Sequence, residues 1–276
     1  MNKSILEIRL PDGREIFYLN VEEVEFLYDR MPNYLQHGVV LKEGDTVFDV
    51  GANIGMFSLM CSKLCNNNVN IYAFEPIPAI YNVLQRNIKR HNSEGVRSFN
   101  YGLSNTNKDL VKFQYYPKAS GFSTMYHNEP KAFRESVGSI MLQNVDELPP
   151  STKKNLTKVP NFLRSSTLNL KLRKALKSQI VNGKTKTISQ VISDRSVEKI
   201  DLLKIDVEKS EYDVLLGIQE PDWSIIKQIV IEAHNIDNRV DSIKALLLNY
   251  GFVNIVAEQE KILKRTEYYN IYATRK

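Results

Sequence analysis

Cysteine is scarce in this chain, with only Cys61 and Cys65 among 276 residues. Two thiols four positions apart on one expected helix are poorly placed for a disulfide and too few for a metal site. We therefore expect two small apolar side chains in a protein of the reducing cytoplasm.

Long apolar runs are also missing. No stretch approaches the about 20 residues that a helix needs to span a bilayer, which argues against a membrane protein. The first ten residues are interrupted by charges and lack the apolar core of a signal peptide. The content of 42% hydrophobic and 25% charged residues is typical of a globular domain.

The chain has no large excess of charge, since its net charge is +5, but that charge is unevenly placed. Residues 127–187 carry +8 and the remainder −3. Leucine or isoleucine recurs every four residues over 168–180, between basic residues, which predicts a basic amphipathic helix. The basic face of such a helix is commonly exposed to solvent while its apolar face packs on the core. The alternative is that the basic face binds an acidic partner. Phe133 and Phe162 are the only aromatics of this segment, which argues against nucleic-acid binding.

The most informative motif is DVGANIG (residues 49–55), which follows the apolar Val47-Phe48. Glu75 ends the next apolar run, about 20 positions further on. A strand, a glycine turn and then an acidic residue is the pattern that holds an adenosine moiety. The middle glycine of a dinucleotide site is replaced by Asn53, and Asp49 precedes the turn. This form favours S-adenosylmethionine, which has no pyrophosphate and has an ammonium that a carboxylate can meet.

The rest of the chain alternates as a βα chain should. Strands are expected at 46–50, 70–75, 96–101, 200–206, 227–233, 252–257 and 268–274, and helices at 55–65, 79–91, 210–219 and 239–250. This predicts an α/β fold resembling the class I methyltransferase, Rossmann-like sheet, with seven strands of which the last is antiparallel. An additional strand is expected at 109–116.

Two further segments surround this core. Residues 1–45 are expected to be an N-terminal extension, with a hairpin of 5–10 and 14–19 around Pro11-Asp-Gly13, and with helices at 22–29 and ending near 34–38. Residues 46–276 form the expected catalytic domain. Within it, 127–187 is predicted to be an inserted helical cap over the acceptor site.

Four motifs together resemble one family. Residues 47–55, 74–76, 100–104 and 203–208 are similar, in order and spacing, to the FkbM family of S-adenosylmethionine-dependent O-methyltransferases, over about 25–275. Much of that family has a glycine where this chain has Lys209. With 34–38 and 115–120, this makes the chain similar to members embedded in polyketide and nonribosomal peptide synthases, which methylate hydroxyls on carrier proteins.

The resemblance implies where the donor and the substrate bind. The expected donor residues are Asp49, Gly51, Asn53, Gly55, Glu75, Pro76, Asn100, Gly102, Leu103 and Asp206, with Tyr28 and Tyr34 closing over the sulfonium. The expected substrate contacts are Glu208, Tyr116 and Ser120. The excess positive charge of residues 127–187 separately predicts Arg173, Lys174 and Lys177 as contacts to an acidic carrier protein.

Of the four histidines, only His234 sits at the carboxyl end of an expected parallel strand, where open α/β sheets bind ligands. We therefore predict His234 as the general base that activates the acceptor hydroxyl. Glu232 shares its face by period-two alternation, and Asp206 shares a face with Glu208 on the preceding strand. These carboxylates would orient the imidazole, or alternatively bind Mg2+, which we do not favour.

The sequence thus predicts an O-methyltransferase for a polyketide or peptide intermediate tethered to a carrier protein. One alternative is methylation of a free small molecule, sugar or lipid hydroxyl. Another is a donor-binding structural module without catalysis.

Overall fold

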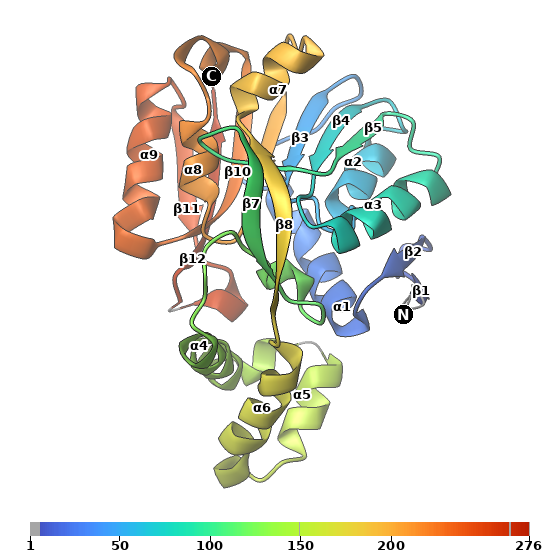
Figure 1. Cartoon of the computed structure of the whole chain (residues 1–276), viewed down its shortest axis with the longest axis vertical. Coiled ribbons are helices and arrows are strands. Elements are labelled where there is room, and N and C mark those ends of the chain that lie inside the picture. The colour runs from blue at the N-terminus through green and yellow to red at the C-terminus, as the bar shows by residue number, and fades with distance from the viewer. Residues whose placement is uncertain (1–5, 149, 265, 276) are drawn as a thin grey trace.

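The computed structural model describes residues 6–148, 150–264 and 266–275 (Figure 1). Ile5, at the start of the expected hairpin, lies outside them. The main sheet consists of β3 (Thr46–Val50), β4 (Asn70–Phe74), β5 (Val96–Phe99), β9 (Leu202–Ile205), β10 (Gln228–His234), β11 (Asn254–Glu258) and β12 (Tyr268–Thr274). Their order is β11-β12-β10-β9-β3-β4-β5, and β12 runs antiparallel to both of its neighbours. The predicted seven-stranded fold with one reversed strand is confirmed.

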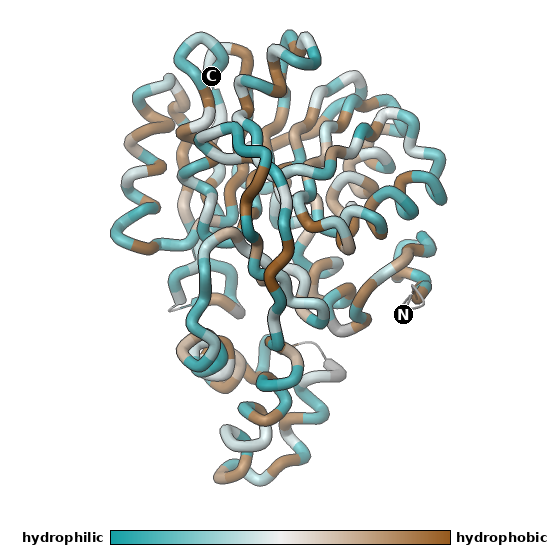
Figure 2. Tube along the Cα trace, viewed as in Figure 1, coloured by the Kyte–Doolittle hydropathy of each residue, from teal (hydrophilic) through white to brown (hydrophobic). Residues whose placement is uncertain are grey.

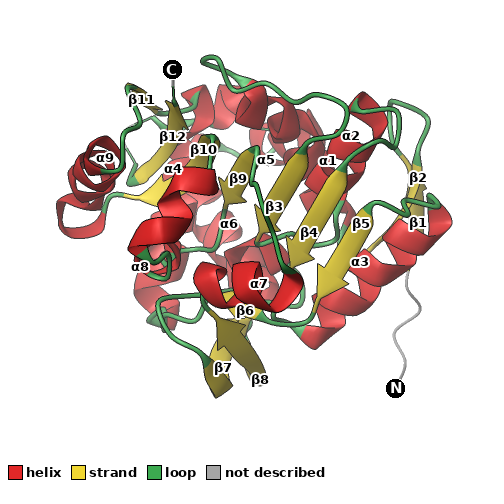
Figure 3. Ribbon diagram, turned by 90° about the horizontal axis from the view of Figure 1, so that it is seen from above, coloured by secondary structure: helices red, strands yellow, loops and turns green. Residues whose placement is uncertain are grey.

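Helices cover both faces of this sheet, as Figure 3 shows from above. One face packs on α7 (Ile188–Arg195), α8 (Glu211–Leu216) and α9 (Arg239–Asn249), and the other on α2 (Met56–Leu64) and α3 (Pro78–Arg90). Parallel strands covered on both faces are apolar almost throughout, and every residue of β3 is buried.

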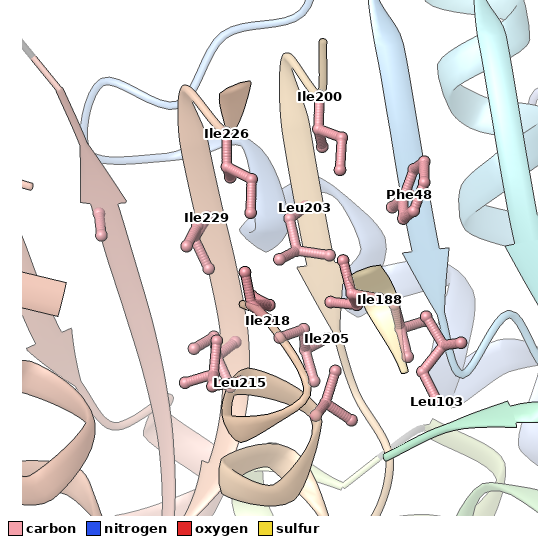
Figure 4. Packing of buried hydrophobic residues seen from close by; sticks show 14 of the residues in the cluster. Phe48, Leu103, Ile188, Ile200, Leu203, Ile205, Leu215, Ile218, Ile226 and Ile229 are labelled. Atoms are coloured by element: carbon pink, nitrogen blue, oxygen red, sulfur yellow. The ribbon is translucent and has the colours of Figure 1, made fainter. Parts of the chain in front are cut away.

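Alternate residues of β3 supply the two cores. Phe48 and Val50 belong to the cluster with α7 to α9, whereas Val47 belongs to the cluster with α2 and α3. Figure 4 shows the first cluster, where Ile188 of α7 and Leu215 of α8 lie against the aliphatic side chains of β9 and β10. This double packing fixes the carboxyl ends of the strands, where the pocket described below opens.

The N-terminal extension contains the expected hairpin, β1 (Leu6–Arg9) and β2 (Glu15–Tyr18), followed by α1 (Val21–Arg30) and the 3-10 helix η1 (Met31–Leu35). Asn87 of α3 anchors it, because its side chain accepts from the Phe17 N–H and donates to the carbonyls of Phe17 and Ile54. These bonds hold α1 beside the carboxyl end of the sheet.

A second sheet and a helical lobe complete the chain. β6 (Gly102–Leu103), β8 (Gln179–Lys186) and β7 (Lys108–Tyr115) pair in that order. Figure 1 shows α4 (Pro130–Gln143), α5 (Pro150–Thr157) and α6 (Asn161–Ala175) as a lobe at the far end of β7 and β8. The short 3-10 helices are η2 (Ser120–Phe122), η3 (Val145–Glu147), η4 (Glu220–Ile225), η5 (Ile236–Asn238) and η6 (Lys261–Leu263).

The expectation that one helix runs through the 168–180 repeat of the 127–187 insertion is therefore corrected. α6 ends at Ala175, and Ile180, which the four-residue period placed on the same helix, lies half-exposed on β8. Ile180, Val181 and Thr185 are β-branched residues, which favour a strand, and β7 offers an antiparallel partner.

The lobe has a small hydrophobic core of its own. Its buried members are Tyr116, Val137, Leu148, Leu156, Leu168, Leu172 and Leu176. Figure 2 shows hydrophobic stretches alternating with hydrophilic ones along its helices, and Phe162 and Leu170 remain largely exposed. No helix in the described part of the chain is both long enough and apolar enough to cross a membrane.

Candidate active site

A pocket opens where β3, β4 and β9 end at their carboxyl termini. Among the residues predicted from the sequence, those that line it are Gly51, Asn53, Glu75, Pro76, Gly102, Leu103, Ser120, Asp206 and Glu208. α1 and the loop that follows β7 contribute further walls, through Leu27 and Met125. Residues from distant segments of the sequence thus surround one cavity, at the edge where open α/β sheets bind ligands.

Glycine is required at two positions of the turn after β3. Gly51 has a φ of 77°, and a Cβ there would lie 1.8 Å from the backbone oxygen of Asp206. Gly55 has a φ of 90° and begins α2, where a Cβ would meet the Leu84 side chain at 2.5 Å. The two glycines therefore let the turn lie directly against β9 and α3, which forms one wall of the pocket.

Glu75 directly follows β4, and its carboxylate lies in the pocket wall. It accepts the backbone N–H of Asn53 at 3.2 Å and of Ile77 at 2.9 Å. Burial raises the pKa of Glu75 to about 7, although both N–H bonds oppose the rise. The carboxylate is thus fixed in position, as a group that accepts hydrogen bonds from ribose hydroxyls must be.

A short chain of side chains ties the pocket to the N-terminal extension. Asn53 Nδ2 donates to Ser120 Oγ at 3.1 Å, and Ser120 Oγ donates to Glu23 Oε1 at 2.9 Å. The Gly121 N–H also donates to Glu23. Burial raises the pKa of Glu23 against these bonds. Sequence analysis did not identify Glu23, because no local motif indicates which residue of a helix will hydrogen-bond to a loop far away in the sequence.

A buried ion pair lies beneath the glycine turn. Lys204 Nζ lies 3.1 Å from Asp49 Oδ1 and 3.6 Å from Asp206 Oδ2. Asp49 also accepts from Ser58 Oγ at 2.7 Å, and the Tyr34 hydroxyl donates to Asp206 Oδ2 at 2.9 Å. Asp49 therefore faces Lys204 rather than the pocket. The sequence signal for Lys204 was a lone charge within the apolar run of β9.

His234, the predicted base, lies behind the pocket wall. Its Nε2 is 3.1 Å from Glu208 Oε2 and its Nδ1 is 3.0 Å from Glu211 Oε1, while the Tyr268 ring lies against it at 4.4 Å. Burial lowers the pKa of His234, but the two carboxylates outweigh it and hold the pKa well above its usual value. The ring therefore lies behind Glu208, with a carboxylate against each nitrogen, and does not line the pocket.

The carboxylates around His234 also differ from the expected set. Glu232 points to Arg30 of α1, with which it forms an ion pair, and Arg30 Nε lies 2.8 Å from Glu260 Oε2. Burial raises the pKa of Glu232, and Arg30 opposes the rise. Glu211, the first residue of α8, takes the place expected for Glu232. Among the described residues, no three His, Cys, Asp or Glu side chains are grouped as metal ligands.

The remaining predicted residues lie away from the pocket. Asn100 Nδ2 donates to the carbonyls of Glu75 and Pro76, so it braces the backbone that carries the carboxylate. Tyr28 packs in the cluster around the hairpin and α1, and Tyr116 is buried in the lobe core rather than facing a substrate.

The predicted basic contacts occupy a separate open concavity. Arg173, Lys174 and Lys177 line it with Lys118 and the exposed Leu170. Among the described residues, none from α4, α5 or α6 lines the main pocket. The loop after β7 joins the two sites, since Lys118 faces the concavity and Ser120 faces the main pocket.

Comparisons with known proteins find one matching family model and several similar chains. A model described as the methyltransferase FkbM domain matches residues 49–253. The chain is 35% identical to the 31-O-demethyl-FK506 methyltransferase FkbM of Streptomyces tacrolimicus, covering 100% of this chain and 99% of the relative. It is 31% identical to the methyltransferase sdnD of Sordaria araneosa, covering 89% of this chain and 88% of that one.

A third relative is much longer. The chain is 32% identical to the AMB antimetabolite synthetase AmbE of Pseudomonas aeruginosa, and the match covers 99% of this chain but 13% of the synthetase. Among solved structures, a methyltransferase FkbM from Methylobacillus flagellatus KT superposes with a TM-score of 0.51 at 12% identity. It covers 87% of this chain and 48% of that one, which shows a shared fold.

Proposed function

The chain belongs to the FkbM family of methyltransferases, and we propose that it transfers a methyl group from S-adenosylmethionine to a hydroxyl of a biosynthetic intermediate. The observation that carries the proposal is the Glu75 carboxylate, buried in the pocket wall beside the Gly51 turn and aligned by two backbone N–H groups. A buried carboxylate that accepts only two hydrogen bonds retains lone pairs for a ligand's hydroxyls.

The residues present fit the proposed donor. Glu75 would bind the ribose hydroxyls, and the Gly51 turn lets backbone lie close to the ligand. Asp206, which the pocket exposes and which Tyr34 and Lys204 hold in place, would meet the donor's ammonium instead of the buried Asp49. When bound, S-adenosylmethionine supplies a methyl group already activated by its positively charged sulfur, which keeps the electron pair of the broken bond.

The protein's own contribution is to place the acceptor oxygen and to receive its proton. The carboxylate of Glu208 lies in the pocket wall, and the loop from Ser120 to Met125 covers the cavity together with α1. This loop is bonded to Asn53 and Glu23, so the cover is attached to both the core and the extension. A covered pocket excludes water that would compete for the methyl group.

For the acceptor we propose an intermediate carried on an acidic carrier protein. Two observations support this choice. The relative AmbE is named as a synthetase, and the chain resembles one segment of it. Lys118, Arg173, Lys174 and Lys177 surround the open concavity beside the pocket, and in the described chain none of the four forms an ion pair. Unpaired cations around an apolar residue suit an acidic surface with a phosphodiester.

Methylation of a free hydroxylated molecule is the second candidate, favoured by one observation. The relative from Streptomyces tacrolimicus is named for methylating demethylated FK506, and it matches this chain over 99% of its own length. Both candidates use the same donor site and differ only in how the acceptor arrives.

The test compares three acceptors with enzyme and S-adenosylmethionine by mass spectrometry. They are a 3-hydroxyacyl carrier protein, its N-acetylcysteamine thioester and a panel of free alcohols and sugars. Preferential methylation of the carrier-bound acceptor supports the first candidate, and equal rates on the thioester or faster rates on a free alcohol support the second. Donor binding without methylation of any acceptor would indicate a structural module and would contradict the proposal.

A further inference from the structure

The wall of the pocket beyond β9 is formed by Glu208 and Ser210. We propose that these two residues form the acceptor subsite. Glu208 is the catalytic base that removes the hydroxyl proton, and Ser210 hydrogen-bonds a second oxygen on the acceptor. His234 is a positioning residue that holds Glu208 from behind. This inference rests on the proposed methyl transfer and deepens it, because it assigns the base and a class of acceptor.

The relative positions of Glu208 and His234 support this assignment. The Glu208 side chain is 12% exposed and lines the pocket, whereas the His234 side chain is 3% exposed and does not. A proton leaving an acceptor in the pocket therefore meets the Glu208 carboxylate first. The ring beyond it has carboxylates against both nitrogens, Glu208 on one side and Glu211 on the other.

The turn that presents Glu208 is held by several bonds. Glu208 has a φ of 46° and Lys209 a φ of 76°, which is an unfavourable conformation for two consecutive side-chain-bearing residues. The Glu208 carbonyl accepts from Thr124 Oγ1 at 2.6 Å, and the Lys209 N–H donates to Glu211 Oε1 at 2.7 Å. Arg239 donates to the Lys209 carbonyl. Strain retained by this many bonds is characteristic of functional sites.

Ser210 supplies the independent observation that points to a ligand. The residue is 2% exposed, lines the pocket, and its Oγ has no hydrogen-bond partner among the described residues. It precedes α8 but does not cap it. A buried hydroxyl without a partner is unfavourable, and an acceptor oxygen would satisfy it.

Together, a carboxylate and an unpaired hydroxyl favour an acceptor with two nearby oxygens. The methylated hydroxyl would face Glu208, and a hydroxyl or carbonyl on the adjacent or next carbon would face Ser210. In the reaction the acceptor O–H bond breaks and its proton joins the Glu208 carboxylate. The electron pair left on the acceptor oxygen forms the new bond to the methyl carbon, while His234 keeps both of its protons.

The first experiment needs no acceptor. Nitrogen-15 NMR of the histidine rings, with His234 assigned through His234→Gln, is followed from about pH 6 to pH 8 in the free protein and with S-adenosylhomocysteine. The groups facing the ring are Glu208, Glu211 and Tyr268. We expect a doubly protonated His234 throughout. A neutral ring at pH 7 would overturn the proposal, since His234 would then be available as the base.

The second experiment measures catalysis with the N-acetylcysteamine thioester of 3-hydroxybutyrate as probe. Glu208→Gln should lower turnover about 10²- to 10⁴-fold with unchanged donor affinity, and added formate should partly restore turnover in Glu208→Ala. The exposed Glu198→Gln is the matched control. Full activity in Glu208→Gln, or rescue of His234→Ala by imidazole to wild-type turnover, would refute Glu208 as base. Absence of donor binding in the wild type would instead refute the proposed function.

The role of Ser210 is tested by comparing an acceptor that has a second oxygen with one that has a single hydroxyl. Ser210→Ala should raise KM for the hydroxybutyryl probe about 2- to 12-fold, as expected for one lost hydrogen bond, and leave KM for 1-butanol unchanged. The exposed Ser242→Ala is the control. Equal effects on both acceptors would contradict recognition of a second oxygen. The ring titration decides the role of His234 whether or not the thioester is methylated.

Discussion

Replacing Lys204 by methionine tests how the centre of the sheet is held together. Lys204 is 3% exposed, and its Nζ pairs with Asp49 at 3.1 Å and with Asp206 at 3.6 Å. It also donates to the Gly51 carbonyl at 2.9 Å. The Asp49 and Asp206 carboxylates raise the pKa of Lys204 despite its burial, so the ion pair is charged in the folded protein. Lys204→Met removes the cation and leaves the anions in place.

The magnitude follows from this arrangement. Removing one partner of a buried ion pair costs about 3–5 kcal/mol, because the remaining charge is uncompensated. For a chain of this size we expect the melting temperature to fall by about 5–10 °C. The double variant Asp49→Asn, Lys204→Met should recover part of this loss, since it removes the most buried of the unpaired charges.

The assay is urea unfolding followed by circular dichroism and by Trp223 fluorescence, so that two probes report on one transition. Lys199→Met is the control, because Lys199 pairs with Asp201 at 2.9 Å but is 47% exposed. Such a pair contributes at most about 1 kcal/mol. A loss below about 1 kcal/mol in Lys204→Met, or an equal loss in the double variant, would refute the reasoning.

Two further predictions concern charge in and beside the pocket. Burial raises the pKa of Glu75 to about 7, so its favourable contribution to stability is present at acid pH and is lost as pH rises through 7. Glu75→Gln should therefore gain about 1–3 kcal/mol of unfolding free energy relative to wild type between pH 5 and pH 8, and an unchanged difference across this range would contradict the raised pKa of Glu75. Reversing Arg173, Lys174 and Lys177 to glutamate should severely slow methylation of a carrier-bound acceptor, and raised salt should slow it in the wild type, while single reversals stay mild. If the charge reversals slowed methylation of the short thioester equally, the surface of Arg173, Lys174 and Lys177 would have no role in binding a carrier protein.

Sequence alone identified several residues that line the pocket, because their signals are local. Gly51 and Glu75 occupy fixed places after two strands, and the structure places both in one cavity wall. The alternation of β10 also correctly put Glu232 on the face of His234. It could not show that Arg30, more than 200 positions away, would take Glu232 as its partner.

The surroundings of His234 illustrate what a single sequence does not reveal. Its partners come from the turn after β9, and the contacts depend on the left-handed backbone of Glu208 and Lys209. No propensity predicts two such residues in succession. The role of Lys204 could not be predicted for a related reason. The sequence shows a lysine within an apolar run, but the carboxylates of Asp49 and Asp206 that pair with it become neighbours only in the fold.

The basic segment shows a different failure. A four-residue period over 168–180 predicted one helix, and its first leucines, Leu168 and Leu172, are indeed buried on α6. The period continued by chance into β8, where pairing with β7 decided the conformation. Long-range strand pairing regularly overrides local periodicity.

Donor binding measured by calorimetry tests the central claim most directly. S-adenosylmethionine is titrated into wild type, Glu75→Ala and the exposed control Glu94→Ala, each shown to be folded by circular dichroism. Two lost hydrogen bonds to a charged group, at about 1.5–3 kcal/mol each, imply at least tenfold weaker binding in Glu75→Ala and no change in Glu94→Ala. Wild-type protein that fails to bind the donor, or a folded Glu75→Ala that binds it equally well, would contradict a donor site built around Glu75.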